Sequence, residues 1–330
     1  MAVLHDSDDI AVCSNFCARV VPSLEVDSRY LAYVFGAAYI LGYTQTAIKQ
    51  TTGIQNLDSE AFLASQWAWP PLEEQRRIAD FLDAETSRID RVIHLSELTV
   101  ANLKERQQVL IDDAIVGSSD RLIKLFWCLD LLRDGTHQPP QRADSGVRFL
   151  TARNVSGGFL RKTELDTFVS LEDATILERS LTLSPGDVLL SVKGTIGACA
   201  VTPEDFPRAV LDRNLALLRP GVGFSSEWLA YALKSRFVQE QMRVAVFAAA
   251  QPGLPLGAIR ELRVPEVGLG DQIRVAGEIH AEADRLLALV GRIQQRTALL
   301  FERKSSLITA AVTGHFDVTT ASGRNLTQGV

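Results

Sequence analysis

The chain contains few cysteines, and they are not spaced as metal ligands. Its 330 residues include four cysteines and five histidines, with no Cys-x-x-Cys pair and no grouping typical of a zinc site. No apolar run is long enough to span a bilayer, and no charged start followed by an apolar stretch marks a signal peptide. We therefore expect a cytoplasmic protein with no metal site and no membrane partner, in which Cys13 and Cys17 are buried as small hydrophobic residues.

Two kinds of catalytic motif are also absent from the sequence. There is no Gly-x-x-x-x-Gly-Lys-[Ser/Thr] phosphate loop, and neither Pro-Pro pair belongs to the Asn/Asp-Pro-Pro-Tyr/Phe motif of an amino-methyltransferase. Glu302 and Lys304 have the Glu-x-Lys spacing of some nucleases, but on a helix two such residues face different directions. An enzyme is therefore the least favoured class.

An internal repeat organises the chain. Residues 74–117 align without a gap on residues 271–314 at a constant offset of 197. A shorter match, at an offset of 198, relates residues 22–33 to residues 220–231. Because a repeat dictates architecture, these matches predict two similar segments that flank a separate domain.

Each copy of the longer repeat predicts a long helix. In the first copy, apolar residues recur in steps of three, four or seven, which is typical of a coiled-coil seam. The residues of this seam are Leu82, Ile89, Ile93, Val100, Leu103, Leu110 and Ala114. A stripe this narrow needs a partner helix, and Gly117 and Gly314 stand where a C-cap glycine belongs. Taken alone, the periodicity favours a helical hairpin or a dimerisation element.

The segment between the repeats, residues 118–270, has the pattern of a mixed domain. Apolar runs separated by Pro-Gly and glycine turns predict strands near residues 181–192 and 209–218. Residues 226–250 have one apolar face and predict a helix. Residues 1–73 match only the distal part of this domain, so we expect a truncated first copy that lacks the leading strands.

Charge is distributed unevenly between these segments. Residues 1–73 hold three basic and eight acidic side chains, whereas residues 121–270 hold 18 basic and 16 acidic ones. The chain as a whole has a formal net charge of −6. Only the middle domain is even mildly basic, so attraction to phosphate is expected only there.

Several motifs in combination resemble one known family. They are the run Pro-Pro-Leu-Glu-Glu-Gln-Arg-Arg-Ile-Ala-Asp at residues 70–80, Asp-Gly-Thr-His-Gln-Pro-Pro at 134–140, Phe-Leu-Thr-Ala-Arg-Asn-Val at 149–155, Gly-Asp-Val-Leu-Leu-Ser at 186–191 and Gly-Thr-Ile-Gly at 194–197. In this order they resemble the specificity (S) subunits of type I restriction–modification systems. Such subunits carry two recognition domains, each for half of a split DNA site, and two long antiparallel helices that set the spacing.

The resemblance implies a reader of double-stranded DNA rather than a catalyst. Methylation would be done by separate methyltransferase (M) subunits, which bind S-adenosylmethionine, and cleavage by a restriction (R) subunit, so this chain would bind no cofactor. The incomplete first domain leaves open whether the chain pairs with a second copy of itself or with a separately encoded front half. The alternative function is a coiled-coil assembly protein that binds partner subunits and no longer reads DNA.

Candidate DNA contacts are polar and basic side chains on loops, because such side chains can meet base edges and phosphates. The loop residues that fit are Arg133, Thr136, His137, Gln138, Arg142, Arg153, Asn154, Lys193, Thr195, Arg213, Asn214 and Gln251. The alternative for each is an ordinary solvated side chain or a structural hydrogen bonder. Gly186 and Asp187 are expected to shape a turn.

The predicted architecture is α+β, with one complete and one partial target recognition domain separated by two long helices that form an antiparallel coiled coil. The expected segments are a partial recognition domain (residues 1–73), a first spacer helix (74–117), a complete recognition domain (118–270), a second spacer helix (271–314) and a C-terminal tail (315–330).

Overall fold

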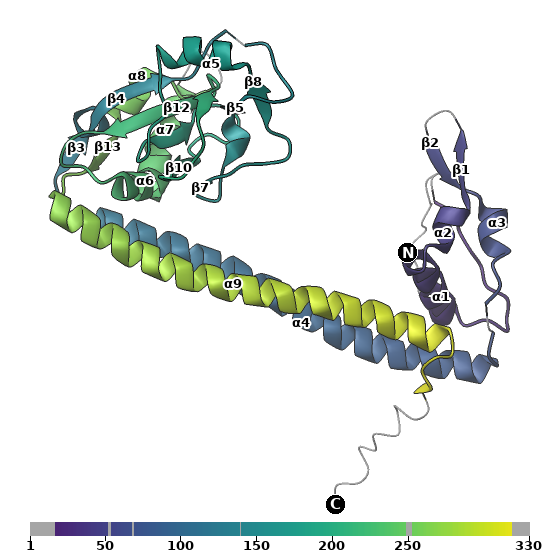
Figure 1. Cartoon of the computed structure of the whole chain (residues 1–330). Coiled ribbons are helices and arrows are strands. Elements are labelled where there is room, and N and C mark those ends of the chain that lie inside the picture. Colours follow the sequence, from purple (N-terminus) through teal and green to yellow (C-terminus); the bar gives the residue numbers. More distant parts are fainter. Residues whose placement is uncertain (1–16, 52–53, 68, 139, 249–252, 319–330) are drawn as a thin grey trace, which may run out of the picture. The chain divides into compact units, whose positions relative to one another are not determined.

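The computed structural model describes residues 17–51, 54–67, 69–138, 140–248 and 253–318. The chain divides into two compact units: unit 1 comprises residues 1–101 and 290–330, and unit 2 comprises residues 102–289. Two long helices, α4 (Leu72–Val116) and α9 (Leu269–Val312), each contribute to both units (Figure 1). Within the described ranges, no helix is long and apolar enough to cross a membrane.

In both units α4 and α9 run antiparallel, as predicted. In unit 1, Lys304 on α9 donates to both carboxylate oxygens of Asp90 on α4, at 2.6 and 2.7 Å, and the end of α9 packs on the start of α4 in one apolar cluster. In unit 2, Arg106 on α4 lies 3.9 Å from Glu282 on α9. Lys304, part of the Glu-x-Lys spacing, is therefore held in an interhelical ion pair.

The predicted seam is buried in the first part of α4 and half-buried further along it. Leu82, Ile89 and Ile93 are at most 7% exposed, whereas the other predicted residues, Val100, Leu103, Leu110 and Ala114, are half-buried. Ile111 and Ile115, which were not predicted, are buried because α4 also packs there against the core of the mixed domain.

Unit 1 adds short elements to its part of the helix pair: α1 (Ser28–Ile40), α2 (Tyr43–Thr46), the antiparallel hairpin β1 (Ile48–Thr51) and β2 (Ile54–Leu57), and α3 (Ser59–Leu63). The core lies where α1 meets both long helices. Tyr30 and Val34 of α1 pack with Leu82 of α4 and Val312 of α9.

Unit 2 is an α+β domain built on three sheets (Figure 1). The largest has the strand order β4-β12-β9-β10-β7-β6, the second β11-β5-β8 and the third β13-β3. The strands are β3 (Leu122–Lys124), β4 (Leu129–Asp134), β5 (Val147–Leu150), β6 (Val155–Ser156), β7 (Phe159–Leu160), β8 (Thr167–Val169), β9 (Val188–Ser191), β10 (Cys199–Val201), β11 (Ala209–Leu211), β12 (Leu215–Pro220) and β13 (Arg263–Pro265). The helices are η1 (Leu125–Cys128), η2 (Ala152–Asn154), α5 (Leu171–Glu178), α6 (Ser226–Lys234), α7 (Arg236–Phe247) and α8 (Leu256–Glu261).

Two predicted elements of unit 2 are each divided in the structure. The helix predicted at 226–250 is broken at Ser235, because the Ser235 hydroxyl accepts from the Val238 N–H and so caps a new helix, α7. The strand predicted at 209–218 is two strands in different sheets, β11 and β12, joined by a turn at residues 212–214.

A buried glutamine fixes the start of each long helix in the same way. Gln75 accepts from the N–H of Asp27 at 2.9 Å and donates to the carbonyl of Pro70 at 2.9 Å. Asp27 is the N-cap of α1. Gln75 therefore ties the N-terminus of α1 to the start of α4.

The second copy of the repeat has the same arrangement. Gln272 accepts from the N–H of Ser225, the N-cap of α6, at 2.8 Å and donates to the carbonyl of Val267 at 2.7 Å. Gln75 and Gln272 are 2% and 0% exposed. The repeat in sequence is therefore also a repeat of buried hydrogen bonds.

We predict that Gln272→Leu destabilises unit 2. The substitution leaves the half-buried Ser225 N–H and Val267 carbonyl without their partners, which costs about 2–4 kcal/mol in the free energy of unfolding. Urea unfolding measures this loss. The control is Gln295→Leu on the exposed face of α9, expected within about 0.5 kcal/mol of the parent; equal effects of the two substitutions would contradict the assigned role.

Candidate nucleic-acid interface

Four segments of unit 2 meet at one edge of its sheets. Strands β4 and β9 both pair antiparallel with β12, so their carboxyl ends lie at the same edge. The Val192 N–H donates to the Asn214 carbonyl at 2.9 Å, and the Asp212 N–H donates to the Leu150 carbonyl at 2.8 Å. We call residues 135–142, 151–154, 193–197 and 212–214 the loop rim.

The first rim segment, residues 135–142, is anchored by its backbone. The Thr136 N–H donates to the Leu211 carbonyl at 2.9 Å, and a Cβ on Gly135 would lie 2.2 Å from that same oxygen, so only glycine fits. The Thr136 hydroxyl donates to the Gln138 carbonyl at 2.9 Å. Thr136 therefore shapes the loop, while Gln138 is exposed at the surface.

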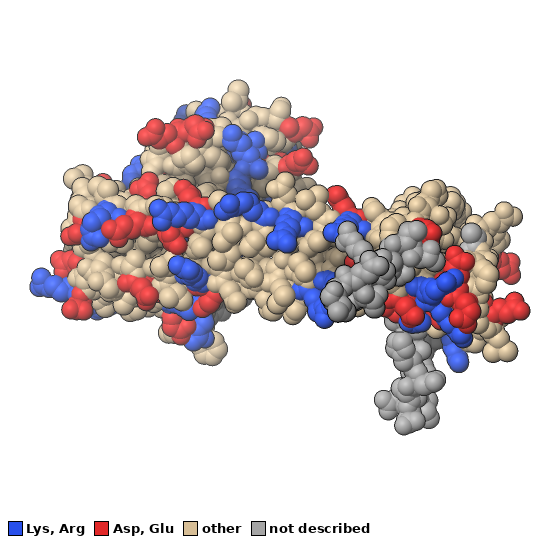
Figure 2. Space-filling model, turned by 90° about the horizontal axis from the view of Figure 1, so that it is seen from below, with Lys and Arg blue, Asp and Glu red and all other residues tan. Residues whose placement is uncertain are grey.

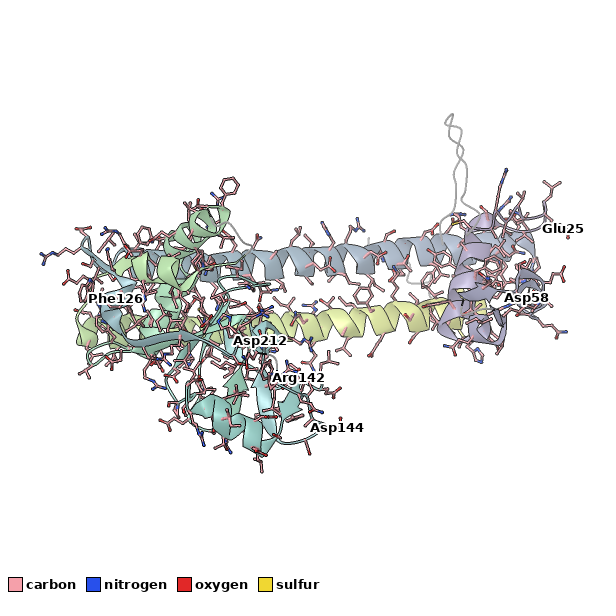
Figure 3. All side chains as sticks on the ribbon, turned by 90° about the horizontal axis from the view of Figure 1, so that it is seen from above. Glu25, Asp58, Phe126, Arg142, Asp144 and Asp212 are labelled. Atoms are coloured by element: carbon pink, nitrogen blue, oxygen red, sulfur yellow. The ribbon has the colours of Figure 1, made fainter. Side chains whose placement is uncertain are left out.

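Two further candidates of this segment are partly engaged within the domain. The Nε2 of His137 lies 2.7 Å from a carboxylate oxygen of Asp134. The guanidinium of Arg142 lies 3.5 Å from the ring centroid of Phe149, a cation–π contact over a buried ring. Figure 3 labels Arg142 together with Asp144 and Asp212, which lie on the same side of the domain.

Arg133 and Arg153 are held at the surface by backbone carbonyls. Arg133, on β4, donates to the Ser180 carbonyl at 2.9 Å, and Arg153, on η2, donates to the Leu165 carbonyl at 3.2 Å. Both bonds are exposed. Their guanidinium groups keep further donors for another partner.

Asn154 is placed differently from the other candidates, because its side chain is 1% exposed. Its Oδ1 accepts from the Thr151 N–H at 2.9 Å, and its Nδ2 donates to the Arg161 carbonyl at 3.0 Å and to Asp166 at 2.7 Å. The amide is therefore fully engaged inside the domain. Asn154 shapes the segment that displays Arg153.

The carboxylate partner of Asn154, Asp166, is itself buried in an ion pair with Arg148. Burial raises the pKa of Asp166, but hydrogen bonds from Thr163, Asn154 and Arg148 outweigh it and hold the pKa below its ordinary value of 3.8. No motif marks Arg148 or Asp166 in the sequence, because their partners come from different parts of the chain.

The rim also displays two cations that the fold does not use. The side chains of Lys193 and Arg213 are exposed, and within the described ranges neither takes part in a hydrogen bond or ion pair. The Val192–Asn214 backbone bond joins their two segments. Unpaired cations on adjoining loops are suited to phosphate oxygens.

Polar side chains flank these cations. Asp212 Oδ1 accepts from the Asn214 N–H at 2.7 Å, which forms a tight turn and leaves the Asn214 amide uncommitted among the described residues. The hydroxyl of exposed Thr195 lies 3.5 Å from that of Ser191. Gln251 lies outside the described residues, although the neighbouring Leu254 N–H donates to the Val192 carbonyl at 2.9 Å.

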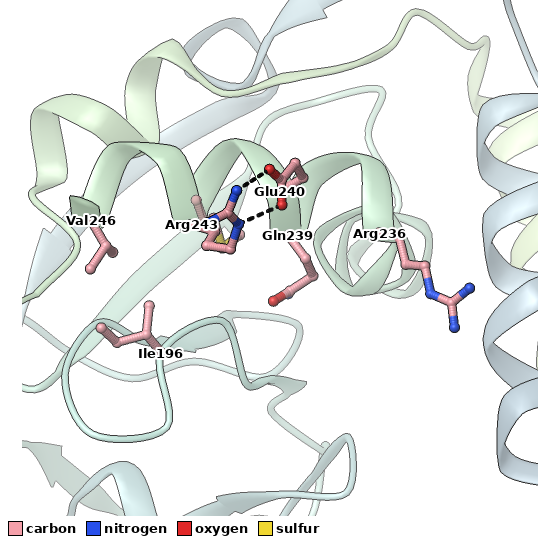
Figure 4. A pocket seen from close by; sticks show the side chains of 7 residues that line it. Ile196, Arg236, Gln239, Glu240, Arg243 and Val246 are labelled. Carbon is pink, nitrogen blue, oxygen red and sulfur yellow. Dashed lines mark hydrogen bonds and ion pairs between the residues drawn. The ribbon is translucent and has the colours of Figure 1, made fainter. Parts of the chain in front are cut away.

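A cavity of unit 2 lies beside the rim. It has a volume of about 500 Å³ and lies between Ile196 and α7 (Figure 4). Arg243 forms a bidentate ion pair with Glu240 at 2.6 and 2.7 Å, and Arg236 forms an ion pair with Glu105 at 2.6 Å. Gln239 donates to the Gly197 carbonyl at 3.0 Å, so this cavity supports the rim loop.

Charge is mixed on the face shown in Figure 2, where Lys and Arg side chains are interspersed with Asp and Glu side chains. Groups of three or more His, Cys, Asp or Glu that could hold a metal are absent from the ranges the structure describes. Recognition of an anionic ligand would therefore depend on local cations such as Lys193 and Arg213.

Comparison with known proteins gives matches only among solved structures. No protein-family model matches the chain, and no curated protein does. A chain from the structure described as "Structural basis underlying complex assembly and conformational transition of the type I R-M system" is 20% identical, with a TM-score of 0.71, over 88% of this chain and 72% of that one. The HsdS subunit from Thermoanaerobacter tengcongensis is 18% identical, with a TM-score of 0.52, over 88% of this chain and 71% of its own.

At these identities the comparison establishes the fold. The chain has the fold of type I restriction–modification specificity subunits, which confirms the predicted α+β class and the two long helices.

We predict that Asp166→Asn destabilises unit 2 in a pH-dependent way. Because the folded pKa is depressed, the stabilisation by this carboxylate is complete above its ordinary pKa of 3.8 and is lost as pH falls through the folded value. At pH 7 we expect a loss of about 2 kcal/mol. Urea unfolding at neutral pH and near pH 3 measures the difference between the two proteins; a gap of equal size at both pH values would disprove the assignment.

Proposed function

We propose that this chain is the DNA-recognition subunit of a type I restriction–modification complex, and that unit 2 reads one half of a split site. The observation that carries the proposal is the loop rim, where uncommitted Lys193 and Arg213 stand among exposed polar side chains. The shared fold supports it. On this proposal the chain is not an enzyme, and it directs the catalytic subunits to their site.

Within the rim, the two cations and the polar side chains have different roles. Lys193 and Arg213 bind phosphate oxygens and so position the domain on duplex DNA. Gln138, Thr195 and Asn214 have the donor and acceptor groups that can distinguish base edges in a groove. Residues already engaged in the fold, such as Asn154, hold these side chains in place.

The catalytic partners are methyltransferase subunits, which bind S-adenosylmethionine, and a restriction subunit. One structural relative is described in terms of the complex assembly of the type I R-M system. In unit 1, the long helices expose apolar side chains away from their common seam: Leu95 is 61% exposed, Leu299 59% and Phe301 51%. Exposed apolar residues on a charged helix pair are suited to a protein partner.

We predict that replacing Lys193 and Arg213 together with alanine weakens DNA binding without changing its sequence preference. Loss of two phosphate contacts lowers affinity for all duplexes and reduces the slope of log K against log salt by about 2. Gel-shift titration with the methyltransferase subunit present measures both quantities. The control is Arg121→Ala, an exposed cation before β3, away from the rim, which should leave affinity and slope unchanged.

A second prediction concerns base reading. Replacing Gln138 and Asn214 with alanine removes groups that meet base edges and should cost about 1–3 kcal/mol of discrimination per lost contact, while the salt slope stays the same. Competition between cognate and altered duplexes measures the discrimination. If the unmodified protein shows no salt-sensitive, sequence-selective binding with or without its methyltransferase, the chain is instead a non-reading assembly protein.

A further inference from the structure

Unit 1 contains a segment that matches a central strand of unit 2. At the repeat offset of 198, residues 17–22 align on β12 (Leu215–Pro220), with Ala18 on Ala216 and Pro22 on Pro220. In unit 2, β12 is paired on both sides, by β4 and by β9. In unit 1, residues 18–22 belong to no strand among the described residues.

The side chains of this segment are exposed where their counterparts are buried. Val20 and Val21 are 46% and 71% exposed, whereas Leu218, the counterpart of Val20, is 0% exposed. Cys17, predicted to be buried, is exposed, and its counterpart Leu215 is 0% exposed.

The residues that follow this segment in the chain show the same contrast in exposure between unit 1 and unit 2. Four half-buried residues of unit 1, together with Val20, line an apolar cavity of about 200 Å³. These four are Leu31, Phe35, Phe62 and Trp67. Their counterparts at the repeat offsets of 198 and 197 are Leu229, Leu233, Ile259 and Val264, all 0% exposed within one core cluster.

In unit 2, β-strands cover the corresponding apolar residues. There, α6 packs on β9, β10 and β12, α8 packs on β4 and η1, and β13 pairs with β3. The strands that enclose the five counterparts are therefore β3, β4, β9 and β10. No described residue of unit 1 supplies their equivalents.

We propose that this surface of unit 1 binds a sheet-bearing polypeptide segment that brings β-strands to both sides of residues 18–22, as β4 and β9 flank β12. Backbone pairing would supply affinity and the apolar cavity would supply specificity, as in strand addition. The partner is a sheet-bearing front part of a recognition domain. A second copy of this chain fits less well, because its own residues 18–22 would cover one side only.

This proposal concerns unit 1 and does not depend on DNA reading by unit 2. The test uses the full chain, coexpressed with residues 119–212 of the same sequence as a separate polypeptide, because that segment carries β3, β4, β9 and β10. Light scattering gives the stoichiometry, and hydrogen–deuterium exchange reports the amides of residues 18–21. We expect a one-to-one complex in which exchange at these amides slows by at least about tenfold.

Two matched substitutions locate the binding surface. Val20→Asp places a carboxylate where the counterpart Leu218 is 0% exposed, and should weaken binding by about 100-fold. Leu24→Asp is the control: Leu24 is 98% exposed, and its counterpart Val222 stays 100% exposed in the complete domain. This control should bind within about twofold of the parent.

Three results would overturn the proposal. The first is fast exchange at residues 18–21 with the added polypeptide in excess. The second is equal binding by the Val20→Asp and Leu24→Asp variants. The third is slow exchange at these amides in the chain alone. If the chain is then a monomer, it covers its own surface; if it is a dimer, the partner is a second copy.

Discussion

The apolar seam shared by α4 and α9 is the constraint on which the other features depend. Each helix carries one narrow buried stripe on a charged surface, and such a stripe is stable only against a second helix. The seam is closed in unit 1 by Leu82, Ile89 and Ile93 and continues in unit 2 through Ile111 and Ile115. In both units the neighbouring structure is then tied to the start of a long helix by a buried glutamine, Gln75 or Gln272.

The loop rim on this scaffold contains two kinds of residue. Some use their side chains to build the site, and others are available to a ligand. Asn154 and Thr136 use their polar groups within the domain, and Arg142 lies over the ring of Phe149. Lys193 and Arg213 have no such role among the described residues. An interface in which some polar side chains are fixed by others is preorganised, so less conformational entropy is lost on binding.

The elements that could be predicted from the sequence are those with a periodic or repeated residue pattern. The seam, the two long helices and the strand pattern are properties of neighbouring residues, and the structure confirms the fold class they indicated. The break at Ser235 and the division of β11 from β12 depend on a local cap and on sheet membership, which an apolar pattern does not reveal. The burial of Asn154 and the cation–π contact of Arg142 could not be predicted, because the sequence does not show that Asp166 lies beside Asn154 or that Phe149 lies beside Arg142. The exposure of Cys17 differs from expectation for another reason: its counterpart Leu215 is buried in an apolar cluster with Leu150, Leu160 and Leu211, which have no described equivalents in unit 1.

The central claim is that the loop rim of unit 2 contacts the bases of a DNA half-site. Photo-crosslinking tests it most directly, with a cognate duplex carrying photoreactive bases and the chain bound to its methyltransferase subunits. The account predicts that crosslinked peptides, identified by mass spectrometry, map to residues 135–142, 193–197 and 212–214. Crosslinks confined to other parts of the chain, or only to the methyltransferase subunits, would contradict it.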